Sequence, residues 1–414
     1  MDSQQLLIKG IDRLEWARTH MDVLNQIGKE IKDNGALEGK TIGMALHVEA
    51  KTGILALTLQ EAGAKVRLAS CNPLSTDDSV AFALNQEYGL ETFAKKGENR
   101  DEYYSNLESV LALNPEITVD DGGDLLFLLH TKHRDKLPGV IGGNEETTTG
   151  IIRLKAMEAQ GELKYPVFAV NNAKMKHLFD NRYGTGQSTF DGILTATNLT
   201  IAGNVFVVAG YGWCGRGIAM RAQGMGANVI VTEIDPVKAV EARMDGFRVM
   251  PMAEAVKEAD FIVSVTGCKD VLMVDHLQDI KDGCVLANSG HFDNEICTSG
   301  LEEVATSKRR VREYVEEYTL PCGKKVYLLG EGRLVNLAAA EGHPSEVMDM
   351  SFADQALTAE WVWTSPRLEV RVHDVPEEID KTVAKLKLGT MGVGIDELTE
   401  RQKEYMGSWD EGTA

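Results

Sequence analysis

A glycine-rich segment near the middle of the chain has the residue types and spacing of a phosphate-binding loop. Residues 210–215 read GYGWCG, follow the apolar run 205–209 and precede a helical pattern. Glycine permits the tight turn and lets a pyrophosphate approach the amides of a helix N-terminus. Glu233, 23 residues after the first glycine, would accept hydrogen bonds from ribose hydroxyls and repel a 2′-phosphate. The pattern predicts NAD rather than NADP, bound by Gly210, Gly212, Trp213, Cys214, Gly215 and Glu233. A plain strand-to-helix turn is the alternative.

Charged and amide side chains follow several other apolar runs. Carboxylates, a lysine and histidines that lie close together can take and return protons. Because parallel strands end at one edge of a sheet, we expect these side chains to meet there. Each has a structural alternative, since Asp-Gly pairs commonly cap turns. The clusters are Asp120-Asp121, Glu145-Glu146, Lys176 with Asp180 and Asn181, and residues 288–293 (NSGHFD).

Two series of apolar runs alternate with longer amphipathic stretches, which is typical of βαβ units. The polar, glycine-rich residues 180–186 separate the series and predict a hinge into a helix. We therefore predict an α/β protein with two doubly wound, Rossmann-like domains. The expected strands lie in residues 40–47, 64–70, 116–121, 140–146 and 167–172, then in 204–210, 228–235, 261–267 and 284–290.

The composition of the 414 residues limits the partners. There are 43 Lys and Arg against 63 Asp and Glu, a formal charge of -20, which disfavours nucleic acid and anionic membranes. No window has about 18 uninterrupted apolar residues, and no signal peptide is evident. Six scattered cysteines predict reduced thiols in the cytoplasm, and no metal site is expected.

Taken together, the motifs resemble the S-adenosylhomocysteine hydrolase family, in order along nearly the whole chain. Residues 331–336 (EGRLVN) and 342–344 (GHP) add to the match. The resemblance implies a split substrate-binding domain, 1–183 and 340–370, enclosing an NAD-binding domain, 184–339. A small helical C-terminal dimerisation segment, 371–414, and a homotetramer are also implied.

The resemblance implies hydrolysis of a thioether between a nucleoside C5′ and homocysteine. NAD oxidises C3′, the ketone acidifies the C4′ proton, homocysteine is eliminated, water adds and the ketone is reduced again. The implied catalytic residues are His47 at C5′, Asp121 at C4′, Lys176 with Asp180 and Asn181 at the 3′-hydroxyl, and His291 as an aligning group. Glu146, Lys176 and Asp180 would bind the ribose, and His343 would close over the substrate.

By the same resemblance, a second set of residues reaches the nicotinamide half of NAD. Several of them lie outside the glycine-loop domain, so both domains would close over the cofactor. Thr147, Thr148 and Thr149 could equally be the start of a helix, with Glu145 or Glu146 complementing the helix dipole. The set comprises Thr147, Thr148, Thr149, Asn181, Asn288, Ser289, Gly290, Asn336 and His343.

The chain departs from the family at Glu49 and Lys51, where relatives acting on the adenosyl substrate have threonine and glutamate. A charged lysine only donates hydrogen bonds, so Lys51 cannot accept from the adenine amine. Hypoxanthine offers an oxo acceptor at C6 and a donor at N1, which Lys51 and Glu49 would match. We therefore expect S-inosyl-L-homocysteine to be preferred. Alternatively, Lys51 and Glu49 pair with each other and adenine is tolerated. Asp77, where relatives often have glutamine, is expected in the same pocket.

Two other classes of function are compatible with parts of the sequence. The glycine loop alone would suit a simple NAD-dependent dehydrogenase, but that function leaves Asp121, Glu146 and Lys176 unexplained. A catalytically silent regulatory relative would have lost such residues, and this chain keeps them.

Overall fold

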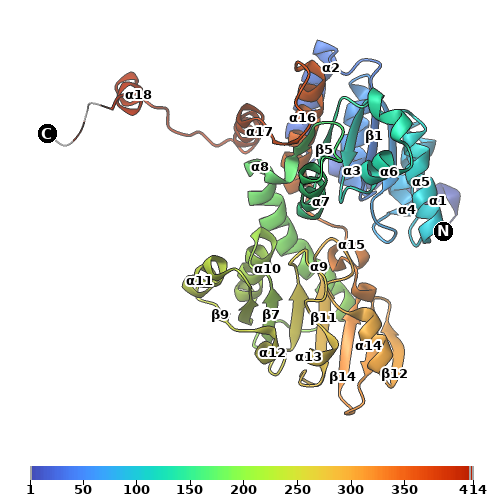
Figure 1. The fold of residues 1–414 in the computed structure, drawn as a ribbon, viewed down its shortest axis with the longest axis vertical. Helices are drawn as coiled ribbons and strands as arrows, with labels where there is room; N and C mark the ends of the chain where they lie inside the picture. Colours follow the sequence, from blue (N-terminus) through green and yellow to red (C-terminus); the bar gives the residue numbers. More distant parts are fainter. Residues whose placement is uncertain (1, 410–411, 413–414) are drawn as a thin grey trace.

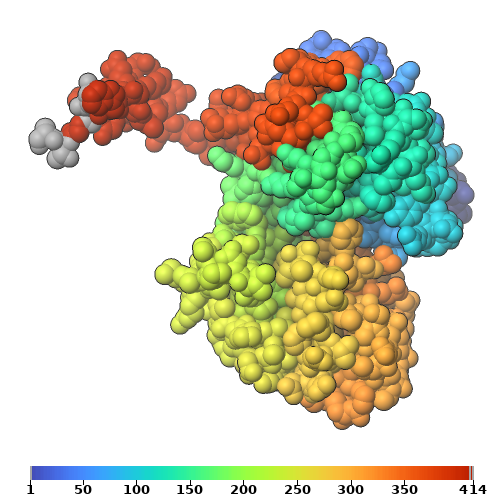
Figure 2. Space-filling view, viewed as in Figure 1, coloured from blue at the N-terminus to red at the C-terminus, as the bar shows by residue number. Residues whose placement is uncertain are grey.

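The structure is a computed structural model that describes residues 2–409 and 412. It contains two sheets in two stacked bodies (Figures 1 and 2). The first sheet is parallel throughout, and its order matches that of a dinucleotide-binding sheet, with a switch point between β1 and β4. In spatial order it holds β15 (Val372–Asp374), β6 (Val167–Ala169), β5 (Gly142–Glu145), β4 (Ile117–Asp120), β1 (Thr41–Leu46), β2 (Lys65–Ser70) and β3 (Glu91–Phe93).

The second sheet repeats this order from β9 to β14, with its switch point between β7 and β10. Its last strands, β12 to β14, run antiparallel to one another. In spatial order it holds β12 (Ser307–Arg312), β13 (Val315–Thr319), β14 (Lys325–Leu329), β11 (Cys284–Asn288), β10 (Phe261–Ser264), β7 (Val205–Ala209), β8 (Asn228–Thr232) and β9 (Arg248–Val249). Every apolar run predicted as a strand contains one, so the prediction of two doubly wound sheets is confirmed.

Helices cover both sheets (Figure 1). Those before the second sheet are α1 (Ser3–Arg18), α2 (Asp22–Asn34), α3 (Ala50–Glu61), α4 (Asp78–Gln86), α5 (Arg100–Leu111), α6 (Asp124–Thr131), α7 (Thr148–Ala159), α8 (Lys174–Lys176) and α9 (Thr185–Thr197). The others are α10 (Trp213–Gly224), α11 (Pro236–Met244), α12 (Met252–Ala255), α13 (Val274–Leu277), α14 (Thr298–Val304), α15 (Val335–Ala338), α16 (Ser345–Thr364), α17 (Glu377–Thr390) and α18 (Glu400–Gly407). Short 3-10 turns occupy Arg134–Gly139, Val170–Asn172 and Gly330–Gly332.

The predicted hinge is helical. Residues His177–Gly184 form a π-helix that runs directly into α9. Glycines allow this segment to pack closely on its neighbours, since a Cβ on Gly217 would lie 1.8 Å from the Arg182 carbonyl oxygen. The first of the two connections between the bodies is therefore helical and closely packed rather than a loop.

The chain returns to the first body after the second sheet. Helix α16 is buried along most of its length and contacts α2, α3 and β5. Residues 372–374, assigned from sequence to the C-terminal segment, form the edge strand β15 of the first sheet.

Helix α18 then lies away from both bodies (Figure 1), and residues 410–411 and 413–414 of that segment lie outside the described residues. Within the described residues, no helix is long and apolar enough to cross a membrane.

Candidate active site

A cavity of about 1530 Å³ lies between the two bodies. It exceeds the roughly 300–1,000 Å³ of a pocket for one small ligand, which leaves room for a cofactor and a substrate. The carboxyl ends of both sheets supply its lining, where ligands bind in open α/β folds. Most of the predicted site residues meet here, namely His47, Glu49, Asp121, Glu146, Thr147, Thr148, Thr149, Lys176, Asp180, Asn181, Gly210, Gly212, Trp213, Cys214, Glu233, Ser289, Gly290, His291, Asn336 and His343.

The glycine loop lies at the switch point of the second sheet. Gly210 has φ +103°, and a Cβ on Gly212, the N-cap of α10, would meet no atom within 4 Å. The loop is therefore open toward the cavity. Gly215 does not line the cavity, because it packs against the loop, where its Cβ would lie 1.9 Å from the Gly210 oxygen. Gly215 thus has a packing role in the loop, and its contact with the cofactor stays a prediction.

Glu233 is fixed at the end of β8 by backbone donors. Its carboxylate accepts from the Tyr211 amide at 2.7 Å and from the amides of Ile234 and Asp235. Asp235 caps α11 by accepting from the Val237 amide at 2.8 Å, with Pro236 at the first helical position. These contacts leave Glu233 as the acidic residue held beside the glycine loop, as the sequence predicts.

Residues predicted near the nicotinamide divide into two groups. Asn336 donates to Ser188 Oγ at 3.1 Å, while its own Oδ1 is buried and has no hydrogen-bond partner among the described residues. That free acceptor in the cavity wall suits a carboxamide donor, so the residues present fit the cofactor. Asn288, in contrast, does not line the cavity; its side chain bonds the backbone of Gly290 and Phe292 and shapes the loop.

Lys176 is the centre of a buried charged cluster. Its Nζ lies 2.8 Å from Asn181 Oδ1, 3.3 Å from Asp180 Oδ1 and 3.4 Å from Glu146 Oε1. Burial favours the neutral amine, but the two carboxyl groups outweigh it and keep the pKa of Lys176 above its ordinary value. Burial also opposes ionisation of Asp180, yet Lys176 and His343 hold the pKa of Asp180 below its usual range.

The pKa of Glu146 is shifted in the opposite direction to that of Asp180. Burial raises the pKa of Glu146 to about 8, although Lys176 and a hydrogen bond from Gln355 Nε2 counteract it. Two carboxyl groups on one ammonium, with pKa values moved in opposite directions, form a cluster that can store and move a proton.

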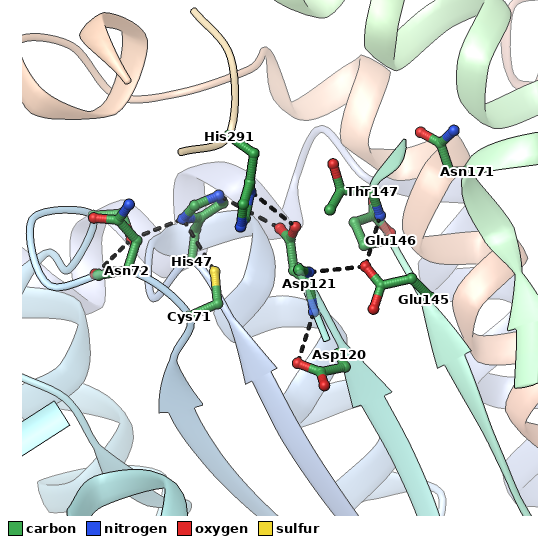
Figure 3. A network of polar contacts seen from close by, with 12 residues as sticks. His47, Cys71, Asn72, Asp120, Asp121, Glu145, Glu146, Thr147, Asn171 and His291 are labelled. Atoms are coloured by element: carbon green, nitrogen blue, oxygen red, sulfur yellow. Dashed lines mark hydrogen bonds and ion pairs between the residues drawn. The ribbon is translucent and has the colours of Figure 1, made fainter. Parts of the chain in front are cut away.

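His47, Asp121 and His291 form a second cluster in the same cavity (Figure 3). Asp121 Oδ2 lies 3.4 Å from His47 Nε2, and Asp121 Oδ1 lies 3.4 Å from His291 Nδ1. Burial lowers the pKa of His47 to about 4, although Asp121 opposes the shift. His47 is therefore neutral near pH 7 and can accept a proton.

His343 faces the Lys176 cluster from the segment before α16. Its Nδ1 lies 2.9 Å from Ser188 Oγ, and its Nε2 lies 3.3 Å from Asp180 Oδ1. A Cβ on Gly184, the last residue of the π-helix, would meet the His343 ring at 2.7 Å. The residue predicted to close over the substrate thus lies directly against the junction of the two bodies.

Two predicted substrate-binding residues, Lys51 and Asp77, do not line the cavity. Lys51 Nζ lies 2.5 Å from Glu49 Oε2 and donates to the Glu341 carbonyl at 2.6 Å, behind Glu49, which does line the cavity. The pairing left open as an alternative is therefore present. Asp77 caps α4 and pairs with Arg13, so the structure gives it a role outside the cavity lining.

Several polar partners of the site were not found from sequence. Ser75 Oγ lies 2.7 Å from His47 Nδ1, and Asn171 Oδ1 accepts from Asn181 at 3.0 Å. Ser351 and Gln355, both buried on α16, bond Asp180 and Glu146. No local motif marks α16 residues as partners, because the contact is made across about 170 to 210 positions. A polar residue within an otherwise buried helix is the one available signal.

Comparison with known proteins agrees with this geometry. Residues 4–141 match the model described as S-adenosyl-L-homocysteine hydrolase, and residues 181–342 match that of its NAD binding domain. The S-inosyl-L-homocysteine hydrolase of Methanocaldococcus jannaschii is 58% identical over 98% of this chain and 97% of its own. The adenosylhomocysteinase of Thermoplasma volcanium is 57% identical over 98% and 99%, and that of Saccharolobus solfataricus 57% over 99% and 98%.

Two doubly wound sheets with a glycine loop and a proton-transfer cavity between them define an NAD-dependent enzyme that acts on a small molecule. The chain belongs to the S-adenosyl-L-homocysteine hydrolase family. Its activity is the NAD-dependent hydrolysis of S-adenosyl- or S-inosyl-homocysteine, and a simple dehydrogenase or a silent relative is not supported.

Proposed function

We propose that S-inosyl-L-homocysteine is the preferred substrate, cleaved reversibly to inosine and homocysteine. The observation that carries the proposal is the buried ammonium of Lys51, held directly behind Glu49, which lines the cavity. Met348 and Phe352 of α16 line the cavity together with Glu49, and their apolar side chains suit a purine ring with its polar edge toward Glu49.

The donors and acceptors beside Glu49 favour hypoxanthine. Lys51 has three ammonium protons, and its partners among the described residues are Glu49 Oε2 and the Glu341 carbonyl, which leaves one donor for a ligand. An oxo group at C6 would accept from that donor, and Glu49 would accept from N1–H. The adenine amine would instead place a hydrogen-bond donor beside the Lys51 ammonium, which has no acceptor to offer. The names of the relatives include both substrates, so they support the reaction but do not choose the base.

Rates on the two substrates test the preference. We expect kcat/KM for the inosyl compound to exceed that for the adenosyl compound by roughly 10- to 10,000-fold, because mispaired buried polar groups cost about 1–3 kcal/mol each. The double variant Glu49→Thr, Lys51→Glu should shift selectivity toward adenine. Lys65→Glu, an exposed lysine changed in the same way, is the matched control. Equal or higher efficiency of the unaltered enzyme on the adenosyl compound would refute the proposal.

The roles of the chain's own residues follow from the two clusters. When bound, NAD supplies a hydride acceptor for C3′ and later returns the hydride. The Lys176 cluster, with Asn181, binds the ribose hydroxyls and takes the 3′-hydroxyl proton. Asp121 removes and returns the C4′ proton. His47 is neutral in the resting site. It takes up a proton, donates it to the departing sulfur, and later accepts a proton from the water that adds at C5′.

Positioning and closure are assigned to further residues. His291 lies 3.4 Å from Asp121 and orients it, while His343 closes the ribose end. Thr147, Thr148 and Thr149 at the start of α7, with Asn181, Ser289, Gly290, Asn336 and His343, hold the nicotinamide half. The substrate-binding domain is proposed as 1–183 and 340–370, extended to the β15 strand, and the cofactor domain as 184–339.

Self-association is part of the proposal. Helix α18 lies away from both bodies, with Tyr405 56% and Met406 72% exposed, and a second copy of the chain would bury them. A homotetramer is the expected state, to be checked by sedimentation. The cytoplasmic location and the absence of nucleic-acid and membrane partners stay predictions from composition.

A further inference from the structure

Glu145 is a buried carboxyl group that has no part in the roles proposed above. It is the last residue of β5, is 1% exposed and lies beside Asp120 of β4 in the parallel register. Its neighbour Glu146 lines the cavity, whereas Glu145 does not. A carboxyl group placed away from both water and ligand costs free energy unless the protein supplies its hydrogen bonds. The function of Glu145 therefore lies in its contacts within the protein.

One oxygen of Glu145 joins two loops of the site. Its Oε1 accepts from the Gly122 amide at 2.8 Å and from the Thr147 amide at 3.1 Å (Figure 3). Gly122 directly follows Asp121, while Thr147 is the N-cap of α7, and both Asp121 and Thr147 line the cavity. The placement of these two side chains thus depends on the same acceptor atom.

The surroundings allow the carboxyl group this close approach. A Cβ on Gly150, in the first turn of α7, would lie 2.1 Å from Glu145, so glycine is required there. Oε2 of Glu145 has no hydrogen-bond partner among the described residues. Burial, together with the charge of Asp120, raises the pKa of Glu145 well above its usual range, which favours the neutral carboxyl group. A neutral group keeps Oε1 as an acceptor, so the two contacts do not need a charge.

We propose that Glu145 is a positioning residue, whose Oε1 holds the turn at Asp121 and the helix start at Thr147 in register with each other. The carboxyl group itself exchanges no proton with the substrate. Its loss should disturb two events at once, namely removal of the C4′ proton by Asp121 and binding of the nicotinamide half of NAD at Thr147. The inference rests on the roles proposed above for these two residues.

Two substitutions separate the acceptor from the charge. Glu145→Met has a similar size and no oxygen, whereas Glu145→Gln keeps an oxygen acceptor for both amides. Calorimetric titration of NAD into cofactor-stripped protein measures the Thr147 side without turnover. Exchange of the C4′ proton of inosine in D2O, catalysed by the NAD-loaded enzyme, measures the Asp121 side.

We expect Glu145→Met to slow C4′ exchange by roughly 10- to 100-fold and to weaken NAD binding by roughly 5- to 10-fold, because two buried amides lose their acceptor. Glu145→Gln should recover most of both losses. With NAD saturating, the loss in hydrolysis should fall on kcat rather than on KM, since the groups that bind the ribose stay in place. Thermal unfolding establishes that each variant is folded.

Glu116→Met is the matched control. Glu116 Oε2 accepts from the Thr41 amide at 3.0 Å, at the opposite end of the same sheet, so this variant also removes a carboxyl acceptor from a backbone amide. It should leave C4′ exchange and NAD affinity unchanged. Equal losses in Glu116→Met and Glu145→Met would show a general effect on the sheet and overturn the proposal.

Three other results would also overturn it. The first is unchanged exchange and NAD affinity in folded Glu145→Met, and the second is a change in only one of them. The third is equal loss in Glu145→Gln, which would mean that the charge or a proton of Glu145 is needed. Asp121→Asn tests the underlying role separately, since undiminished exchange in that variant would refute Asp121 as the C4′ base. Adenosine can replace inosine throughout, so a failure of the proposed base preference is distinguishable.

Discussion

Ser351 Oγ donates a 2.9 Å hydrogen bond to Asp180 Oδ2 inside the protein. Ser351 lies on α16 and Asp180 on the π-helix that joins the two bodies, so one bond connects the hinge to the core of the first body. The remaining contacts of Asp180 are with Lys176 and His343, both at Oδ1. Ser351 is therefore the partner of the second carboxylate oxygen among the described residues.

Replacing Ser351 with alanine should raise the pKa of Asp180, because a bond to the charged form is lost. Asp180 would then take up a proton at a higher pH, and the acidic limb of the kcat/KM profile should move upward. At neutral pH Asp180 stays ionised, and we expect roughly a 5- to 20-fold loss of kcat/KM there, about 1–2 kcal/mol, because one buried carboxylate oxygen has lost its donor. Thr364→Ala, at the exposed end of α16, is the control and should leave the profile in place. An unshifted acidic limb in Ser351→Ala would show that the bond does not tune Asp180.

The close contact between α10 and the π-helix leads to a prediction on stability. Gly217→Ala places a Cβ against the Arg182 carbonyl, so the two helices must separate, at a cost of about 1–3 kcal/mol. Gly224→Ala in the same helix has no atom within 4 Å of the new Cβ and should be neutral or slightly stabilising. Chemical denaturation of both variants measures the difference. Equal stability of the two would mean that the hinge relaxes without strain.

Glu98 should make the stability of the protein depend on pH. It is 5% exposed, its Oε1 has no hydrogen-bond partner among the described residues, and burial raises its pKa from 4.5 to about 7. Between these values the unfolded chain is ionised while the folded protein keeps the proton, so stability falls as pH rises through the window. The loss is complete above about pH 7 and amounts to roughly 3 kcal/mol at most.

Glu98→Gln cannot ionise and should remove this dependence. We expect the variant to be more stable than the unaltered protein at pH 8, with the difference shrinking as pH falls toward 4.5. Unfolding curves at several pH values measure the effect, and Glu87→Gln, an exposed carboxyl group, serves as the control. A constant difference across the range would contradict the raised pKa of Glu98.

Much of the fold is predictable because its signals are local. An apolar run that ends in glycine or an acidic residue marks a buried parallel strand, and each run so identified contains one. The sequence does not predict the antiparallel strand β12 (Ser307–Arg312), since it is exposed along its whole length and carries no apolar pattern. The short edge strands β3, β9 and β15 were missed because two or three residues are too few for a period.

The position of a site residue is predictable where it follows a strand. Its hydrogen-bond partner is not predictable where that partner comes from a segment distant in the sequence. The resemblance placed His47, Asp121 and Lys176 correctly in one cavity. It did not distinguish Asn288, whose side chain holds a loop, from Asn336, which lines the cavity and whose oxygen has no hydrogen-bond partner among the described residues. Asp77 is an N-cap paired with Arg13, a residue 64 positions away, which no local pattern indicates.

Glu233 should control the choice between the two forms of the cofactor. Its carboxylate is surrounded by the amide donors of Tyr211, Ile234 and Asp235, so a glutamine amide cannot satisfy all three. Glu233→Gln should therefore loosen the glycine loop and weaken NAD binding by roughly 10- to 100-fold, corresponding to about 1.4–2.7 kcal/mol. It should weaken NADP binding less, because the charge that repels a 2′-phosphate is gone. Asp235→Asn is the matched control, since asparagine caps α11 as well as aspartate does. Titration of both cofactors into cofactor-stripped protein measures the ratio, and an unchanged preference for NAD in Glu233→Gln would exclude Glu233 as its source.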